Sequence, residues 1–187
     1  MNNFIKIILI VSLTLSLYSQ ETISFIAIGD WGRNGNHHQV SVAEQMSVWA
    51  MNNNARFVIS LGDNMYDKGV TSTDDPQWKT SFEDVYTSEY LQIPWYAALG
   101  NHDYEGNVQA EVDYTSVSSR WKMPSRYYSF TIKLDDTVTV LFVILDTNPI
   151  CKSDAENKSE ALKEISKINN SIQLKWLDST LRSTPAK

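Results

Sequence analysis

The sequence is poor in cysteine, glycine and proline. It has 187 residues but only 7 glycines and 5 prolines, which excludes a long disordered tract. Its single cysteine, Cys151, is unusual for a secreted chain, where cysteines usually come in pairs. Cys151 is therefore either a buried free thiol or half of a disulfide whose partner lies outside this sequence. The formal net charge of −6 disfavours nucleic acid and anionic membranes as partners. It does not exclude a phosphate substrate, because bound cations can reverse the local field.

Long apolar runs are also missing. The longest, Ile7 to Leu17, covers 11 residues without charge, whereas a membrane-spanning helix needs roughly 20. It follows a basic start with Lys6 and precedes Ser19, which is the order of a cleavable secretory signal. We expect residues 1–19 to be such a signal, although a buried N-terminal strand or helix also fits the run. The mature chain is then expected to be soluble, and secreted or lysosomal.

Three short apolar runs end in the same way, with glycine and then a polar side chain. They are Ile23–Ile28 before Gly29-Asp30, Phe57–Leu61 before Gly62-Asp63, and Pro94–Leu99 before Gly100-Asn101. Such runs are typical of buried strands. Residues 39–53 and 78–86, which lie between them, carry apolar side chains at helical spacing. Strands that alternate with helices predict an α/β fold with a parallel sheet and right-handed crossovers.

The second half of the chain has a different pattern. The β-like runs Tyr127–Lys133 and Val138–Leu145 flank Asp135-Asp136, which predicts a hairpin in a mixed sheet or in a second sheet. Residues 151–168 are polar and rich in lysine, which indicates an exposed loop or a frayed helix. Residues 172–181 have the apolar spacing of an amphipathic helix.

Polar side chains at the ends of successive parallel strands predict a shared site. Ligands bind beyond the carboxyl ends of such strands, where Asp30, Asp63 and Asn101 lie. One such aspartate alone is more often a helix N-cap, but the repeated ending favours convergence. Taken alone, the neighbouring Tyr66 could be a packed aromatic side chain and His102 an N-cap or core histidine. Carboxylate, phenolate and amide oxygens are hard donors that suit iron, and Asp63 is the candidate to bridge a metal pair.

These blocks resemble those of a known family. Gly29-Asp30-Trp31-Gly32, Gly62 to Tyr66 and Gly100 to Tyr104 resemble the first three signature blocks of calcineurin-like metallophosphoesterases. The Asp63-x-x-Tyr66 spacing is similar to the purple acid phosphatases, and flanking residues 80–86, 93–96, 120–128 and 145–147 to their small, tartrate-resistant type. The resemblance implies a β-sandwich flanked by helices in α/β/β/α layers. Residues 20–187 would form its N-terminal part, without the C-terminal strands.

The resemblance also implies an acid phosphatase that hydrolyses phosphate monoesters at an Fe(III)–M(II) centre, where M is iron, zinc or manganese. Asp30 and Tyr66 would bind the ferric ion, with the phenolate giving a purple colour. Asp63 would bridge the metals and Asn101 would bind the divalent ion. A metal-bound hydroxide would attack phosphorus directly. His102 would contact the phosphate and help to protonate the leaving alcohol. The protein would be monomeric.

The family's later histidine blocks do not occur in this sequence. Its other histidines, His37 and His38, do not match ligand positions, and we expect them at the surface. The chain is therefore expected to be incomplete, and weakly active or inactive alone. The resemblance implies that Cys151 would pair with a cysteine of the missing part. It also implies that residues 151–168 would form a protease-sensitive loop over the active site.

Two other functions remain open. One is a short secreted glycoprotein on the same scaffold without catalysis, with glycans at the sequons of Asn157 and Asn169. The other is a phosphodiesterase or nuclease on this scaffold, which Tyr66 disfavours because other metallophosphoesterases generally lack that phenolate.

Overall fold

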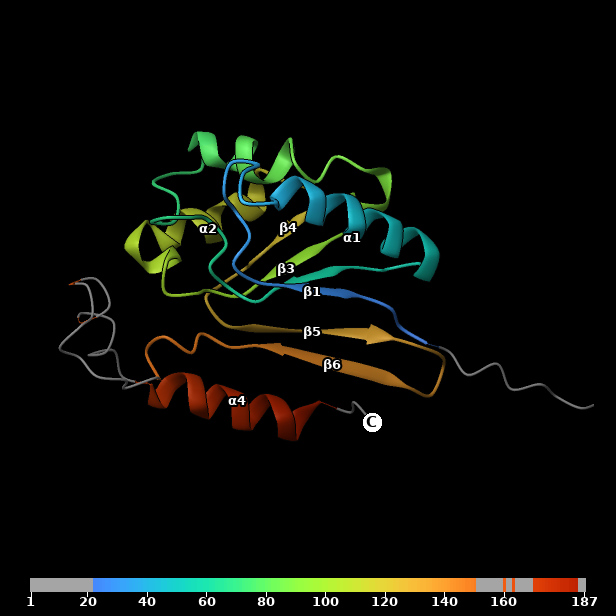
Figure 1. Cartoon of the computed structure of the whole chain (residues 1–187). Helices are drawn as coiled ribbons and strands as arrows, with labels where there is room; N and C mark the ends of the chain where they lie inside the picture. Colours follow the sequence, from blue (N-terminus) through green and yellow to red (C-terminus); the bar gives the residue numbers. More distant parts are fainter. Residues whose placement is uncertain (1–21, 151–159, 161–162, 164–169, 185–187) are drawn as a thin grey trace, which may run out of the picture.

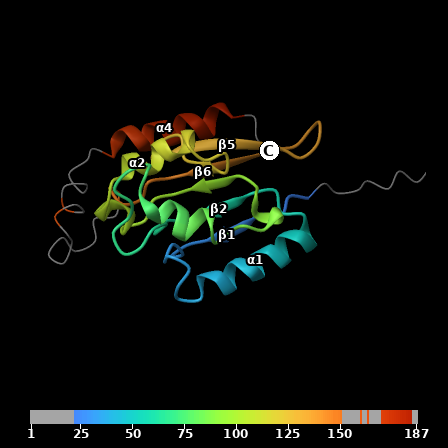
Figure 2. The same cartoon turned by 90° about the horizontal axis from the view of Figure 1, so that it is seen from above.

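The computed structural model describes residues 22–150, 160, 163 and 170–184, which form four layers (Figure 1). Helix α1 (Gln39–Asn53) covers a parallel sheet, an antiparallel hairpin lies beneath that sheet, and helix α4 (Ser171–Ser183) covers the hairpin. Seen from above, α1 and α4 again lie on opposite sides of the strands (Figure 2). The predicted α/β/β/α order is confirmed. The predicted signal, Cys151 and both sequon asparagines lie outside the described residues.

The parallel sheet has four strands in sequence order. They are β1 (Ile26–Ile28), β2 (Val58–Ser60), β3 (Trp95–Ala97) and β4 (Trp121–Lys122). All three strand pairs are parallel, which confirms the three predicted strands, although each is shorter than its apolar run. The fourth strand was not predicted, because two residues are too few to show a periodic pattern. All four strands run in the same direction, so the ends of the first three meet at one edge.

The core between α1 and this sheet is largely aromatic. Trp31 lies 5.6 Å from Trp95 and 5.5 Å from Tyr86 between ring centroids, and all three side chains are buried. Edge-to-face contacts of this kind add to the stabilisation from burial alone. The segment predicted as a helix at 78–86 begins as a π-helical turn, η1 (Trp78–Glu83), in which Asp84 N donates to Lys79 O at 2.9 Å. This wide turn still buries the predicted Phe82.

Helix α1 has the predicted bounds but a narrower buried face. Ala43, Met46 and Ala50 are buried, as their spacing of three to four residues predicts. Val40 and Val48, which were predicted for the same face, are 46% and 49% exposed. Val40 borders the buried row and Val48 lies on the far side of the helix from it, so the prediction was wrong for these two residues.

Short elements lie on both sides of the third strand. The 3₁₀ turn η2 (Glu89–Leu91) precedes β3. Three elements connect β3 to β4, namely η3 (Asp103–Glu105), helix α2 (Val108–Asp113) and η4 (Tyr114–Ser116). Asn107 caps α2 by accepting a hydrogen bond from Gln109 N at 3.1 Å. This connection packs α2 directly behind the loop that follows β3.

The second sheet is the predicted hairpin, and it is separate from the first. Strands β5 (Tyr128–Lys133) and β6 (Thr139–Ile144) pair antiparallel. Phe130 stacks on Tyr96 with ring centroids 3.6 Å apart, and Phe142 meets Phe57 edge-to-face at 5.2 Å. These aromatic contacts join the two sheets.

Helix α4 forms where the amphipathic pattern predicts it. Ile172, Leu174 and Leu181 are exposed, whereas Trp176 and Leu177 are half-buried, and the Trp176 ring lies 5.0 Å from the Tyr127 ring between centroids. The buried residue is Gln173, whose amide accepts from Asp146 N and donates to Asp146 O, each at 2.9 Å. A paired amide with its hydrogen bonds satisfied is stable in a buried position. Among the described helices, none has the length and apolar character needed to cross a membrane.

Candidate metal centre

The loops after β1 and β2 bring two carboxylates to the same edge of the parallel sheet. Asp30 N donates to Gly62 O at 3.2 Å, which joins the two loops directly. Asp30 and Asp63 both adopt left-handed backbone conformations, with φ of 60° and 51°. Aspartate tolerates this region better than most residues, and such outliers concentrate at functional sites. The backbone therefore holds both carboxylates in a fixed, strained arrangement.

The hydroxyl of Tyr66 connects the two carboxylates. It lies 2.6 Å from Asp30 Oδ1 and 2.7 Å from Asp63 Oδ2. Burial, together with the hydrogen bonds to the two carboxylates, raises the pKa of Tyr66 well above its ordinary value of 10.0. The structure thus brings together three of the predicted donors, and they are all hard oxygen ligands.

The loop after β3 approaches the same cluster through its backbone. His102 N donates to Asp63 Oδ1 at 3.0 Å, and the His102 ring lies 4.4 Å from the Tyr66 ring between centroids. A Cβ on Gly100 would lie 2.1 Å from Asp63 N, so only glycine allows this approach. His102 Nδ1 is 2.5 Å from the carbonyl oxygen of Asp67, which places its proton on Nδ1.

Asn101 is the predicted ligand whose side chain makes no contact with Asp30, Asp63 or Tyr66 through a hydrogen bond. It lies beside His102 at the correct edge of the sheet, but its side chain is exposed and makes no hydrogen bond to the described part of the chain. Within the described residues, no group of three His, Cys, Asp or Glu side chains could hold a metal. A metal at this edge therefore depends on the phenol of Tyr66 or the amide of Asn101 in addition to the two carboxylates. This oxygen-only set fits a hard ion such as iron.

Asp103, for which no role was predicted, joins the loops. This fully buried carboxylate accepts hydrogen bonds from Asn64 N at 2.8 Å, Met65 N at 3.2 Å and Gly100 N at 2.8 Å. It thereby joins the loop after β2 to the loop after β3. Burial is the main cause that raises the pKa of Asp103 to about 6, while the three N–H donors oppose the shift.

A second buried acid, Glu111 of α2, lies behind Asp103. Asn64 Nδ2 donates to Glu111 Oε2 at 3.0 Å and to Asp103 Oδ2 at 3.1 Å, so one amide links both carboxyl groups. Burial, and then the charge of Asp103, raises the pKa of Glu111 well above its ordinary value. Its Oε1 has no hydrogen-bond partner among the described residues, which favours a neutral carboxyl group. Sequence reasoning missed Glu111 because an acid on a short helix normally faces solvent.

Arg33 is a further residue that sequence reasoning missed. Its guanidinium carbon lies 3.5 Å from the centroid of the Tyr66 ring, and its Nη1 lies 3.7 Å from Asp67 Oδ1. A cation over an aromatic face is attracted by the ring quadrupole. No spacing rule links residue 33 to residue 66, so only the folded chain reveals this contact.

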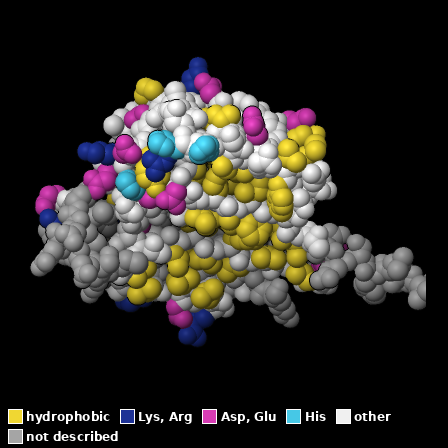
Figure 3. Space-filling model, in the orientation of Figure 1, with side chains coloured by type: hydrophobic (Ala, Val, Ile, Leu, Met, Phe, Trp, Pro, Cys, Tyr) yellow, Lys and Arg dark blue, Asp and Glu magenta, His cyan; other side chains and the backbone are white. Residues whose placement is uncertain are grey.

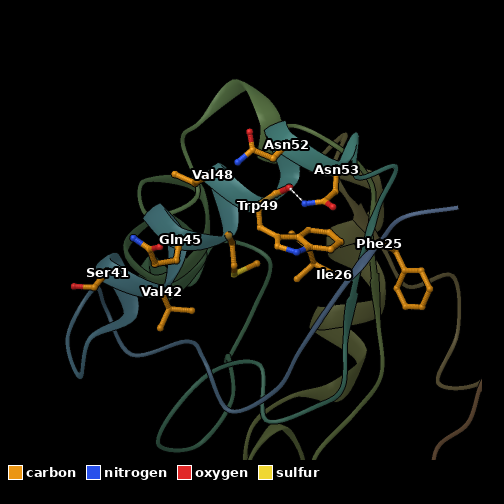
Figure 4. A pocket seen from close by; sticks show the side chains of 10 residues that line it. Phe25, Ile26, Ser41, Val42, Gln45, Val48, Trp49, Asn52 and Asn53 are labelled. Carbon is orange, nitrogen blue, oxygen red and sulfur yellow. Dashed lines mark hydrogen bonds between the residues drawn. The ribbon is translucent and has the colours of Figure 1, made fainter.

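An apolar hollow of the described surface lies away from these residues. It has a volume of about 690 Å³ and lies between α1 and β1, where Phe25, Ile26, Val42 and Trp49 line it (Figure 4). Asn53 Nδ2 donates to Trp49 O at its rim. None of its lining residues is charged, so it offers no group for acid–base or metal chemistry.

The fold and these strand-end oxygens define a metallophosphoesterase, and comparison with known proteins agrees. The sequence profile of the calcineurin-like phosphoesterases matches residues 23–180, and the chain belongs to this family. It is 35% identical over 185 residues to tartrate-resistant acid phosphatase type 5 of Mus musculus, covering 95% of this chain and 57% of the mouse protein. It is 44% identical over 130 residues to purple acid phosphatase 4 of Arabidopsis thaliana, covering 68% of this chain and 37% of the plant protein.

A solved structure is also similar. GAP50, the anchor in the inner membrane complex of Plasmodium, superposes with a TM-score of 0.60 at 25% identity. The match covers 76% of this chain and 46% of GAP50. This chain therefore spans about half the length of the proteins that it resembles.

Proposed function

We propose that this chain supplies the N-terminal metal ligands of an acid phosphatase that hydrolyses phosphate monoesters at a dinuclear centre. The proposal rests on the position of the Tyr66 hydroxyl, which lies 2.6 Å from Asp30 Oδ1 and 2.7 Å from Asp63 Oδ2. Relatives named as purple and tartrate-resistant acid phosphatases support the reaction class. Because the chain spans about half of their length, we expect the 187 residues alone to bind metal weakly and to turn over slowly.

The proposed ligands divide between two metals. Asp30 and Tyr66 would hold Fe(III), Asn101 would hold a divalent iron, zinc or manganese ion, and Asp63 would be shared by the two. As a ligand, Tyr66 would lack the hydroxyl proton that now lies between the two carboxylates. When bound, the metal pair supplies Lewis-acid activation of the nucleophile and neutralises charge on the phosphate. The strained Asp30 and Asp63 backbones fix the direction of their carboxylates before any metal arrives.

His102 is proposed as the residue that contacts the phosphate and protonates the leaving alcohol. Its backbone N–H is held by Asp63, and its Nδ1–H by the Asp67 carbonyl oxygen. These two hydrogen bonds fix both the loop and the ring orientation. Because Nδ1 keeps its proton, the proton given to the leaving oxygen would come from Nε2 of the doubly protonated ring, which ends as the neutral Nδ1–H form. We also propose that residues 1–19 are a secretory signal and that the phosphatase is secreted or lysosomal, because Lys6 precedes the short uncharged run Ile7–Leu17.

Iron titration tests the proposal on the chain itself. We expect ferric iron, added as its citrate complex to the purified chain, to produce a visible phenolate-to-iron absorption band that saturates only with excess iron. Tyr66→Phe is expected to abolish the band and to lower iron affinity by at least about tenfold, as for other changes around a metal. Tyr90→Phe is the matched control, because Tyr90 is 41% exposed and lies in η2, away from the cluster.

The same samples are then assayed with p-nitrophenyl phosphate in the presence of iron and zinc. Slow hydrolysis that disappears in Tyr66→Phe and persists in Tyr90→Phe is the expected result. An absorption band that survives in Tyr66→Phe, or the absence of a band at every iron concentration, would contradict the proposed centre.

A further inference from the structure

A buried side chain follows each of three proposed site residues in the sequence. These neighbours are Trp31 after Asp30, Asn64 after Asp63, and Asp103 after His102. Figure 3 shows carboxylate, histidine and basic side chains gathered on one part of the surface. The three neighbours do not contribute to that surface, because their side chains are buried. The loops at the strand ends therefore carry a buried set of polar atoms in addition to the exposed one.

A serine hydroxyl connects the first two of these neighbours. Ser60, the last residue of β2, is fully buried. Its Oγ accepts a hydrogen bond from Trp31 Nε1 at 2.7 Å and donates one to Asn64 Oδ1. The direction is fixed, because an indole N–H can only donate and an amide oxygen can only accept. The loop after β1 is thus joined to the loop after β2 through buried side chains.

The amide of Asn64 extends this connection to the third loop. Its Nδ2 donates to Ala98 O at 2.8 Å, directly after β3. The same nitrogen lies 3.1 Å from Asp103 Oδ2 and 3.0 Å from Glu111 Oε2. Asp103 in turn accepts from Gly100 N at 2.8 Å. One side chain therefore contacts the end of β3, the loop that follows it, and helix α2.

These hydrogen bonds form one continuous network and not separate pairs. It runs from Trp31 through Ser60 and Asn64 to Asp103 and Glu111. A buried polar network whose members find partners is rigid and specifies one arrangement. Removing one member leaves its neighbours unpaired away from water, which costs more than an ordinary hydrogen bond contributes. A change at one end of the network should therefore affect the loop at the other end.

We propose that Ser60 and Glu111 are positioning residues for the metal centre. Both act through Asn64, and together they hold the loops after β1, β2 and β3 at the separation that the proposed ligands need. The inference rests on the proposed function, because the ligands give these loops their role. Groups that support metal ligands from behind typically change metal affinity by about 10–100-fold. The network therefore adds two residues that no ligand pattern in the sequence contains.

Hydrogen exchange tests the network on the metal-free chain. Ser60→Ala is expected to accelerate amide exchange at Gly100 roughly tenfold, although Asn64 and Asp103 lie between the two residues. Exchange at Leu134, whose N–H is hydrogen-bonded in the hairpin, reports general loosening of the protein and should not change. Unchanged exchange at Gly100, or an equal acceleration at Leu134, overturns the network.

A second serine provides the matched control for that substitution. Ser47 Oγ forms a hydrogen bond of 2.5 Å with Ser88 Oγ, which joins α1 to the start of η2. Ser47→Ala thus also removes a hydroxyl that links two distant segments, but outside the network. Exchange at Gly100 should be the same in Ser47→Ala as in the wild type. Acceleration there would show that the loss of a serine hydroxyl affects Gly100 without any network.

Iron titration then tests whether the network serves the ligands. Glu111→Ala is expected to lower the affinity for iron, added as ferric citrate and followed by the phenolate–iron band, about tenfold. Glu111→Gln keeps an oxygen for Asn64 Nδ2 and should change that affinity less than about threefold. Ser60→Ala should resemble Glu111→Ala, and Ser47→Ala the wild type.

The titration separates failure of the network from failure of the metal centre. An iron affinity of Glu111→Ala equal to that of the wild type, with the band present, overturns the positioning role alone. Equal losses in Glu111→Ala and Glu111→Gln overturn it as well, because the hydrogen bond to Asn64 would then not matter. A missing band in the wild-type chain refutes the metal centre, and the positioning role falls with it.

Discussion

The two sheets of this molecule differ in how completely they are covered, and the chemistry follows that difference. All three residues of β2 are buried, whereas in β6 only Ile144 is buried. Parallel strands need cover on both faces, and here α1 and the hairpin provide it. The hairpin has cover from the first sheet and from α4, but its side chains stay partly exposed. The candidate ligands all follow strands of the fully covered sheet.

The comparison also separates two ways of fixing a loop. After β2 and β3, buried Asp103 gathers three backbone N–H groups from two loops. The hairpin turn relies on Asp135, whose Oδ1 accepts from Thr137 N at 2.6 Å and Val138 N at 2.7 Å at an exposed position. The first arrangement couples distant parts of the chain and excludes water, while the second is local. We expect only the first to influence the site.

Replacing a phenylalanine by alanine in the core of the first sheet and in the hairpin should give the largest difference in the free energy of unfolding. Phe82 is fully buried against Trp95 at 5.1 Å, and Phe82→Ala is expected to lower the free energy of unfolding by about 3–5 kcal/mol. Phe142 in β6 is only partly buried, so Phe142→Ala is expected to cost about half as much or less. Urea denaturation of both variants measures this. Equal losses would show that the hairpin is as important for the core as the first sheet.

Substitution of Glu111 should lower the free energy of unfolding by less than Phe82→Ala does, and the loss should depend on the residue introduced. Glu111→Ala removes an acceptor from Asn64 Nδ2 and leaves a cavity, and it is expected to cost about 1–3 kcal/mol. Glu111→Gln keeps an oxygen for Asn64 and replaces a neutral carboxyl group by a neutral amide, so we expect a change below about 1 kcal/mol. Faster amide exchange at Asn64 and Gly100 should accompany the alanine variant only.

The pH dependence sharpens the test of Glu111. Its folded-state pKa is raised, so the native state binds more protons than the unfolded chain above pH 4.5, the ordinary value. The stability contributed by this group is complete below that pH and is lost as the pH rises through the folded-state pKa. Glu111→Gln should therefore flatten the decline of stability on the alkaline side of pH 4.5. A variant whose stability falls with pH as steeply as the wild type would show that Glu111 is ionised in the native protein.

The sequence predicted most of the first sheet because each strand carries its own ending. Gly62 and Gly100 mark the points where the loops approach each other. Asp63 meets Asp30 and Tyr66 as expected, whereas the Asn101 side chain makes no hydrogen bond to them. The role of Tyr66 was predicted only through the resemblance of the Asp63-x-x-Tyr66 spacing to the purple acid phosphatases. Arg33 and Glu111 could not be predicted, because their roles depend on side chains more than thirty residues away along the chain.

The docking of α4 could not be predicted for a related reason. The apolar spacing of residues 172–181 predicted the helix, but not that Gln173 would dock it through the backbone of Asp146. A periodic pattern identifies a helix without showing which of its faces meets a neighbour. The fourth strand, β4, was missed because it has no pattern of its own. Its two residues are identified as a strand only by their pairing with β3.

The smallest effect should come from a substitution in the hairpin turn. Amide exchange in that variant tests whether the hairpin turn and the loops of the first sheet are independent. Asp135→Ala removes the acceptor for Thr137 and Val138, so amide exchange at those two residues should accelerate. The hydrogen bonds from Thr137 lower the pKa of Asp135, so the wild-type turn should loosen in the same way as pH falls and that carboxylate is protonated. Exchange at Gly100 should not change in either case, because no contact of Asp135 reaches the first sheet among the described residues. Acceleration at Gly100 would instead show that the hairpin turn helps to hold the loop that carries Asn101 and His102.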